Sequence, residues 1–257
     1  MLRTCIGICS ILLLAACEKV IDLPLENEEP KIVIEGVVDD SNYEQWVKVS
    51  QTTPFDSDSG PVFVSGASVR VIAPGGRVVS YEESRPGYYM AQNFRGVSGQ
   101  SYRLEVSYNG AQYAASSTMP SKVSVDSIGF SQSTILDRSF RTINVLLQDP
   151  EDEENYYRFV LSSNRDDVQQ AFIYNDKYNN GKKVIYNLNS VDMKLQAQDS
   201  IFLDVMTLDA PVYAYWKGID GQNPGAANPA NPPSNFSNGA LGYFSAHTLK
   251  TIRVEVE

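Results

Sequence analysis

The sequence predicts a mainly β protein, in which an N-terminal β-sandwich of the immunoglobulin or transthyretin type is followed by a second β-rich domain with one short helix. Three observations support this fold class. Short segments alternate apolar and polar side chains, as in residues 102–108, which is the period of a half-buried strand. Turn residues such as Asn109-Gly110 separate these segments. Helical spacing with a capping residue occurs only after Asp209.

The first residues have the layout of a bacterial lipoprotein signal. Residues 1–16 contain Arg3, a short apolar stretch and two alanines before Cys17, and the stretch is too short to span a membrane. The ending Leu-Ala-Ala-Cys resembles a lipobox, so we expect cleavage before Cys17 and acylation of its thiol. Acyl chains on Cys17 would anchor the mature protein in a membrane. A plain signal peptide with an incidental cysteine is the alternative.

The rest of the N-terminal region predicts a lipidated tether without disulfides. Residues 17–30 are acidic and contain prolines, and they carry too few apolar residues to fold alone. The cysteines are Cys5, Cys9 and Cys17, so the folded part has no disulfide and no cysteine-based metal site. A net charge of −10 without a basic stripe argues against nucleic-acid binding.

Residues 31–120 are predicted to form the β-sandwich domain. An Asn-Gly pair between two alternating runs is the strongest short-range signal for a hairpin. Counting both arms of that hairpin gives seven strands, which is typical of a sandwich. The predicted strands are residues 31–39, 44–52, 67–73, 77–83, 87–92, 101–108 and 111–117.

Residues 121–257 are predicted to form the second β-rich domain. Asp209 is the expected N-cap of its helix and Gly221 its expected end. The helix carries Val212, Tyr215, Trp216 and Ile219 on one face, which either packs on the sheet, as we favour, or forms a ligand platform. Before the helix, strands are expected at residues 127–133, 142–149, 155–163, 171–176, 182–188 and 200–208. After it, a Gly/Pro/Asn-rich loop at 222–239 precedes two final strands, 239–249 and 251–257.

The sequence gives no positive signal for catalysis. His247 is the single histidine, and no G-x-S-x-G elbow, P-loop or dinucleotide fingerprint accompanies it. Paired carboxylates remain a catalytic alternative that spacing alone does not select. Strand alternation places His247 on the same face as Tyr243 and Ser245. We therefore interpret His247 as structural or partner-facing, and we predict a protein that is not an enzyme and holds no cofactor.

Two clusters offer alternative binding roles. Asp149, Asp152 and Glu153 supply oxygen ligands of the kind that calcium prefers, but without EF-hand spacing. A solvated acidic turn without metal is the favoured interpretation. Tyr174 and Tyr178 could stack on a sugar or peptide ligand. Cross-strand packing of these tyrosines is the simpler alternative.

The quoted segments also resemble a known family. In order, CEKVIDLPL, KIVIEGVVDD, WVKVSQTTPF, VSGASVRV, PGYYMAQNFRGVSGQSYRLEV, DPEDEENYYRF and NPPSNFSNGALGYFSAH are similar to the Bacteroidota lipoproteins of domain-of-unknown-function family four-two-four-nine. The resemblance covers nearly the whole mature chain. It implies an outer-membrane lipoprotein that is often encoded beside TonB-dependent transporters and has no established enzymatic activity.

Two serines match a short modification pattern. Ser127 and Ser200 each lie in an Asp-Ser-Ile sequence, which fits the pattern for O-glycosylation in Bacteroidota. Both sites could equally be ordinary strand entries.

Together these features predict a non-catalytic lipoprotein, anchored in the outer membrane through Cys17 and facing the cell surface. Its expected role is to associate with a TonB-dependent transporter and to assist nutrient binding or uptake. The loop at 222–239 is the candidate contact surface because it is longer than an ordinary connection. The alternative is a structural or adhesive surface lipoprotein without a transport role.

Overall fold

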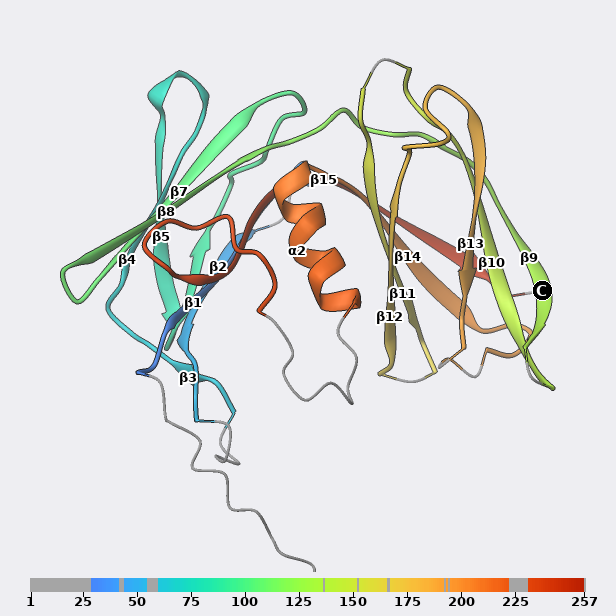
Figure 1. The fold of residues 1–257 in the computed structure, drawn as a ribbon, viewed down its shortest axis with the longest axis horizontal. Coiled ribbons are helices and arrows are strands. Elements are labelled where there is room, and N and C mark those ends of the chain that lie inside the picture. The colour runs from blue at the N-terminus through green and yellow to red at the C-terminus, as the bar shows by residue number, and fades with distance from the viewer. Residues whose placement is uncertain are drawn as a thin grey trace, which may run out of the picture.

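The computed structural model describes residues 29–41, 44–54, 60–135, 137–151, 153–165, 167–191, 193, 195–221 and 231–256. In this part of the chain the protein is mainly β, with one short α-helix, as the sequence predicts. Figure 1 shows two β lobes side by side, with the helix α2 between them and the strand β15 running from one lobe into the other.

The strands follow one another in chain order through both lobes. Those of the first lobe are β1 (Ile32–Asp39), β2 (Gln45–Gln51), β3 (Val62–Phe63), β4 (Ser68–Ile72), β5 (Val78–Arg85), β6 (Tyr88–Ala91), β7 (Ser101–Tyr108) and β8 (Ala111–Thr118). Those of the second lobe are β9 (Val125–Ile135), β10 (Arg138–Gln148), β11 (Tyr156–Ser163), β12 (Gln169–Asn175), β13 (Lys183–Asn189) and β14 (Ser200–Leu208). The shared strand is β15 (Leu241–Glu255), the helix is α2 (Ala210–Asp220), and a 3-10 turn occupies Pro74–Gly76.

The first lobe is one sheet that folds over on itself. Its strand order is β15-β1-β2-β6-β5-β4-β7-β8, with β3 beside β2. The strand β5 forms the corner, because residues 78–81 pair with β4 and residues 82–85 pair with β6. The fold-over encloses a single core, to which Ile34, Val47, Leu104 and Phe244 contribute fully buried side chains.

Side chains close the gap between the two ends of this folded sheet. Ala246 of β15 donates its N–H to the Ser117 hydroxyl of β8 over 2.8 Å. Asn235 forms two hydrogen bonds with the backbone of Phe244, of 2.9 and 2.8 Å. Ser237 donates its backbone N–H to the Ala114 carbonyl of β8 and accepts the Ala114 N–H with its hydroxyl. The segment around Asn235 therefore covers edges that would otherwise expose unpaired backbone groups.

The second lobe consists of two sheets packed face to face. One sheet has the order β12-β11-β14-β15 and the other β13-β10-β9. Their inward-facing side chains form a second core, in which Ile143, Tyr157, Phe159 and Leu203 are fully buried. Alternation along each strand puts one residue in two into this core.

The strand β15 corrects one expectation and crosses the expected domain boundary. The sequence predicts two final strands, 239–249 and 251–257, but residues 241–255 form one continuous strand. Its first half pairs in parallel with β1, and its second half pairs antiparallel with β14. No proline or turn sequence interrupts residues 248–251, so the strand continues. Phe236, Ala240 and Phe244 pack in the first core, although the predicted second domain includes them.

Two local predictions are confirmed by backbone geometry. Asn109 and Gly110 have φ values of 48° and 78° between β7 and β8, the left-handed pair that a tight type I′ hairpin turn requires. The helix α2 begins after Asp209, whose side chain accepts a hydrogen bond from the N–H of Val212, and it ends at Gly221. The sequence therefore predicts both the hairpin and the helix ends correctly.

Candidate functional site

A pocket of about 170 Å³ lies where the two lobes meet. The first lobe contributes residues from β1 and β2, the second lobe contributes β11, β14 and α2, and β15 lines it from both sides. Its lining is apolar (Val37, Met206, Leu208, Leu249), aromatic (Trp46, Trp216, Tyr243) and polar (Asp39, Arg158, Ser245, His247). We call this the interlobe pocket.

The alternation of β15 divides its side chains between the pocket and the first core. Tyr243, Ser245 and His247 line the interlobe pocket, whereas Phe244 and Ala246 are buried in the core. Successive strand residues point to opposite faces, so this division follows directly from the sequence. The prediction that His247 shares a face with Tyr243 and Ser245 is confirmed.

Ser245 and His247 form a buried polar pair. The Ser245 hydroxyl lies 2.8 Å from Nδ1 of His247, and the two residues are 1% and 6% exposed. The pKa of His247 is lowered to about 4, chiefly by burial and in smaller part by Arg158, while Asp39 and Asp40 act in the opposite direction. The imidazole is therefore neutral at pH 7, and a base this weak removes a hydroxyl proton poorly.

Arg158 places a cation in the pocket without a carboxylate partner. It stands on β11 opposite Met206 of β14, and its guanidinium lies 3.9 Å over the ring of Trp216. Its Nη1 donates to the Met206 sulfur over 3.6 Å, and its Nε is buried with no hydrogen-bond partner. Burial lowers its pKa. Across the described chain, no ion pair includes Arg158.

The helix α2 holds Trp216 against the sheet. The rings of Tyr215 and Trp216 lie 4.9 and 5.0 Å from that of Tyr243. At the start of the helix, Asp209 also accepts hydrogen bonds from the Ser117 hydroxyl and the Thr118 N–H, at 2.7 and 2.9 Å. The aromatic face of the helix therefore packs on the sheet, as favoured above, and Trp216 also lines the interlobe pocket.

The structure does not bring Tyr174 and Tyr178 together. Tyr174 packs against Phe159 and Tyr186 beside the second core, at 5.9 and 4.7 Å, and its hydroxyl donates to the Asn187 carbonyl. Tyr178 lies in a turn and is 80% exposed. The packing alternative therefore describes Tyr174, while Tyr178 remains an exposed ring.

The acidic turn uses its buried carboxylate internally. Asp149 is 1% exposed, and it accepts hydrogen bonds from the Tyr157 hydroxyl and the Gly181 N–H. Glu153 is exposed and accepts from Ser121, while Asp152 lies outside the described residues. The described residues contain no group of three or more His, Cys, Asp or Glu side chains placed to hold a metal ion.

The two candidate glycosylation serines differ in accessibility. Ser127 is exposed on β9. Ser200 is 8% exposed, and its hydroxyl accepts a hydrogen bond from Arg253. A glycan fits on Ser127 without rearrangement, whereas on Ser200 it would displace a paired strand residue.

The membrane anchor and most of the long loop lie outside the described residues. Cys17 and residues 222–230 belong to this group. Residues 235–238, at the end of the loop, have a structural role, because their hydrogen bonds link β8 and β15. Among the residues described, no helix has the length and apolar character needed to cross a membrane.

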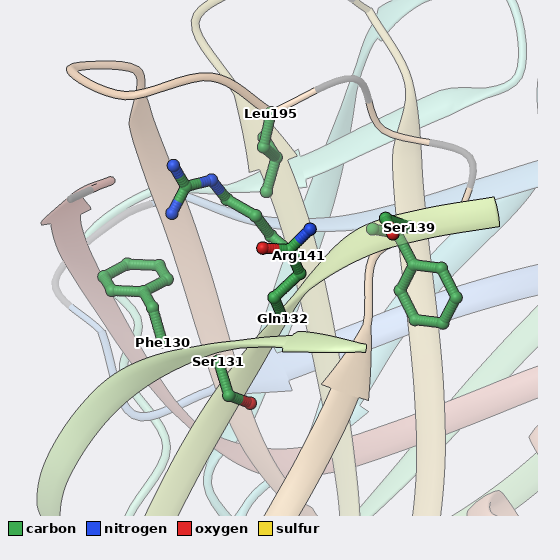
Figure 2. A pocket seen from close by; sticks show the side chains of 7 residues that line it. Phe130, Ser131, Gln132, Ser139, Arg141 and Leu195 are labelled. Atoms are coloured by element: carbon green, nitrogen blue, oxygen red, sulfur yellow. The ribbon is translucent and has the colours of Figure 1, made fainter. Parts of the chain in front are cut away.

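A second, more open hollow of about 480 Å³ lies at the far end of the second lobe. Figure 2 shows its labelled side chains coming from β9, from β10 and, for Leu195, from the segment before β14. Its walls combine neutral polar residues (Ser131, Gln132, Ser139), apolar residues (Phe130, Phe140, Leu195) and Arg141. It lacks the buried charge and the paired aromatic rings of the interlobe pocket, which is the stronger candidate site.

Sequence reasoning did not identify Arg158 or Trp46 as site residues. Both occupy the polar-facing positions of alternating strands, where charged and amphipathic side chains are ordinary. A weak signal was present, since Tyr156 and Val160, which share a strand face with Arg158, are aromatic and apolar.

Comparisons with known proteins place the chain in a family without giving it an activity. A two-domain fibronectin type III segment from chicken tenascin matches with a TM-score of 0.27 at 10% identity, covering 89% of this chain and 100% of that chain. A cytokine receptor complex matches with a TM-score of 0.25 at 11% identity, covering 87% of this chain and 95% of that chain. Neither likeness is close enough to bear on function, and no curated protein matches. The family model described as "Domain of unknown function (DUF4249)" matches residues 18–253, and the chain therefore belongs to this family.

Proposed function

We propose that this protein is a non-catalytic, lipid-anchored outer-membrane protein that associates with a TonB-dependent transporter and binds a small nutrient molecule. The observation that carries the binding role is the interlobe pocket, a concave and mainly apolar site with a few converging polar groups. Such sites are the usual places for small ligands. The described volume of about 170 Å³ suits a ligand of few atoms.

The chemistry of the pocket favours binding over catalysis. In the pocket, the hydroxyl of Ser245 is hydrogen-bonded to the imidazole of His247, and burial makes this imidazole a weak base. The backbone N–H groups that flank Ser245 donate to other partners, that of Phe244 to Asn235 and that of Ala246 to the Ser117 hydroxyl, so they are not free to stabilise an oxyanion. We therefore propose that His247 supports the pocket wall and does not take part in a reaction.

The membrane location is supported by the sequence that precedes the fold. The lipobox ending at Cys17 and the acidic tether through residue 30 would hold the lobes near the outer membrane, facing the cell surface. Confinement to a membrane raises the effective concentration of the protein toward membrane partners. The partner itself, a TonB-dependent transporter, is proposed from the family resemblance.

The finer fold type is also a proposal. We assign the first lobe to the immunoglobulin or transthyretin type because its strands form two layers around one core. The corner at β5 and the short hairpin at Asn109 support this assignment.

The anchor and the partner can be tested together. Tagged protein carrying Cys17→Ala is expected to leave the outer-membrane fraction, because acylation of that thiol would be lost. The matched variant Cys9→Ala changes a cysteine in the same leader and should leave fractionation unchanged. Native tagged protein, solubilised in mild detergent, should co-purify with a β-barrel transporter identified by mass spectrometry.

Three results would contradict the proposal. Cys17→Ala protein that still sediments with outer membrane after a high-salt wash would rule out the lipid anchor. A native purification that brings down no β-barrel would rule out the transporter partner. Resistance to protease in intact cells, combined with digestion after lysis, would place the protein on the periplasmic side.

A structural or adhesive role is the second candidate, favoured by one observation. The strand β15 runs unbroken through both lobes, which makes the molecule suitable as a stiff spacer. Self-association of the purified protein without any transporter would support this role over the first.

A further inference from the structure

We infer that the interlobe pocket binds a small monocarboxylic acid with an apolar body, and that Arg158 holds its carboxylate. This inference deepens the proposed function and rests on its binding role. The juxtaposition that carries it is a half-buried guanidinium with no carboxylate of the described chain within ion-pair distance, set among apolar and aromatic walls in a preformed cavity.

Arg158 carries a positive charge that no carboxylate of the described chain pairs with. A guanidinium stays protonated in proteins, and a buried charge is normally paired because an unpaired one is costly to desolvate. No carboxylate in the described chain pairs with Arg158, and its Nε has no partner. An anion entering the pocket would supply a counter-charge to the guanidinium.

The position of the Arg158 guanidinium against Trp216 suits a planar anion. The guanidinium carbon of Arg158 lies 3.9 Å from the centroid of the Trp216 ring, and this cation–π contact uses a face of the guanidinium while its N–H groups lie at the edge. A planar carboxylate can meet such an edge with two parallel hydrogen bonds. Because the ring of Trp216 is held by Tyr243, the cation is positioned before any ligand arrives.

The charges of the residues that line the pocket favour a singly charged anion. Arg158 is the single cation in the lining, and Asp39 adds a carboxylate to the same pocket. One cation beside an acidic group suits a singly charged ligand better than a phosphate dianion. His247 stays neutral at pH 7, so it adds no second positive charge.

The apolar walls and the volume of the pocket favour a hydrocarbon body for the ligand. Val37, Met206, Leu208 and Leu249 supply apolar walls, which favour a hydrocarbon group beside the carboxylate. A cavity of ~150 Å³ is known to hold a benzene-sized molecule, and the interlobe pocket measures about 170 Å³. A six-membered ring bearing one carboxylate is therefore a suitable probe.

The chain contains its own reporter for this test. Its two tryptophans, Trp46 and Trp216, both line the interlobe pocket. Detergent-solubilised full-length protein is titrated with cyclohexanecarboxylate and, separately, with the neutral cyclohexanecarboxamide, while tryptophan fluorescence is recorded. We expect a saturable change with the acid, with a Kd of about 1 mM as befits so few atoms, and a much weaker one with the amide.

Two arginine variants assign the effect. Arg158→Gln should weaken acid binding ~10- to 100-fold, the range of a lost charged hydrogen bond. The matched variant Arg85→Gln removes a guanidinium that lies 3.7 Å over Tyr88 outside the pocket, and it should bind like the parent. Thermal unfolding of each variant checks the fold, and the comparison of acid with amide on the parent protein stands even if Arg158→Gln does not fold.

The outcomes separate this inference from the proposed function. Equal binding of acid and amide, no saturable change with either, or unaltered binding in folded Arg158→Gln would overturn the inference. If a short peptide with a free C-terminus binds, but its C-terminal amide and the small acids do not, the inference of a small acid is wrong. The ligand would then be the C-terminal carboxylate of a peptide. Co-purification of the transporter is measured separately, so failure of the carboxylate site leaves that result standing.

Discussion

Acidification should destabilise the fold through His247. Because this is the single histidine of the chain, every imidazole effect belongs to it. Its pKa is about 4 in the fold and about 6.5 in an unfolded chain. Between these values the unfolded chain binds a proton that the folded protein does not. The contribution of the neutral His247 imidazole to the unfolding free energy is therefore fully present above pH 6.5, and it is lost as the pH falls toward 4.

The size of this loss follows from the two pKa values. The full difference corresponds to about 3 kcal/mol of unfolding free energy, and about 2.5 kcal/mol of it is already lost near pH 4.5. Carboxylates also contribute to the pH dependence of stability, since burial raises the pKa of Asp209 and hydrogen bonds from Arg165 lower the pKa of Asp199. A comparison with His247→Gln, which cannot titrate, isolates the imidazole because the carboxylates are common to both proteins.

Urea unfolding near pH 7.5 and near pH 4.5 provides the measurement. The parent protein should lose about 2.5 kcal/mol more than His247→Gln between these conditions. The imidazole NMR signals of the folded protein should show a midpoint close to pH 4. Parallel pH profiles for the two proteins, or an NMR midpoint near 6.5, would refute the reasoning. Such a midpoint would also make the Ser245–His247 pair a credible nucleophile and base.

Two substitutions test the junction between β15 and the first lobe. Gly242 has φ of 94°, and a Cβ there would lie 2.1 Å from the Ile34 carbonyl oxygen; Gly242→Ala should cost ~3 kcal/mol or more, since backbone must shift. The matched Gly239→Ala, at φ of 71° with open space around it, should cost only ~1 kcal/mol of left-handed strain, and equal losses in urea unfolding would contradict this. Asn235→Ala should cost about 1–3 kcal/mol by leaving buried backbone groups of Phe244 without their partner; unchanged hydrogen exchange at Phe244 would argue against it.

Local patterns predicted most elements because their causes are local. The Asn109-Gly110 turn requires left-handed backbone, and the cap at Asp209 requires a carboxylate before a helix. The join of the lobes could not be found this way. Nothing within residues 241–255 indicates that one half pairs with β1 and the other with β14, since those partners are set by tertiary packing.

The candidate site escaped prediction for the same reason. Arg158 and Trp46 are separated by over a hundred residues, and each one alone resembles an ordinary solvent-facing strand residue. Their common pocket exists because β15 aligns β1 with β14 across the lobe boundary. The face of His247 was predictable, because alternation along one strand decides it. Its neutral state was not, because burial by the opposite lobe sets its pKa.

The two lobes that form the interlobe pocket are connected by Asp40 and Asp209, which do not line the pocket. Asp40 accepts hydrogen bonds from Lys122 and from the Leu249 N–H, at 2.5 and 2.7 Å, and so ties the end of β1 to the second lobe. Asp209 ties the start of α2 to β8. With β15 continuous between them, a hinge motion of the lobes would have to break a paired strand and the carboxylate contacts of Asp40 and Asp209. A ligand therefore meets a preformed site and spends little of its binding free energy on ordering the protein, which makes a weakly binding small acid a realistic occupant.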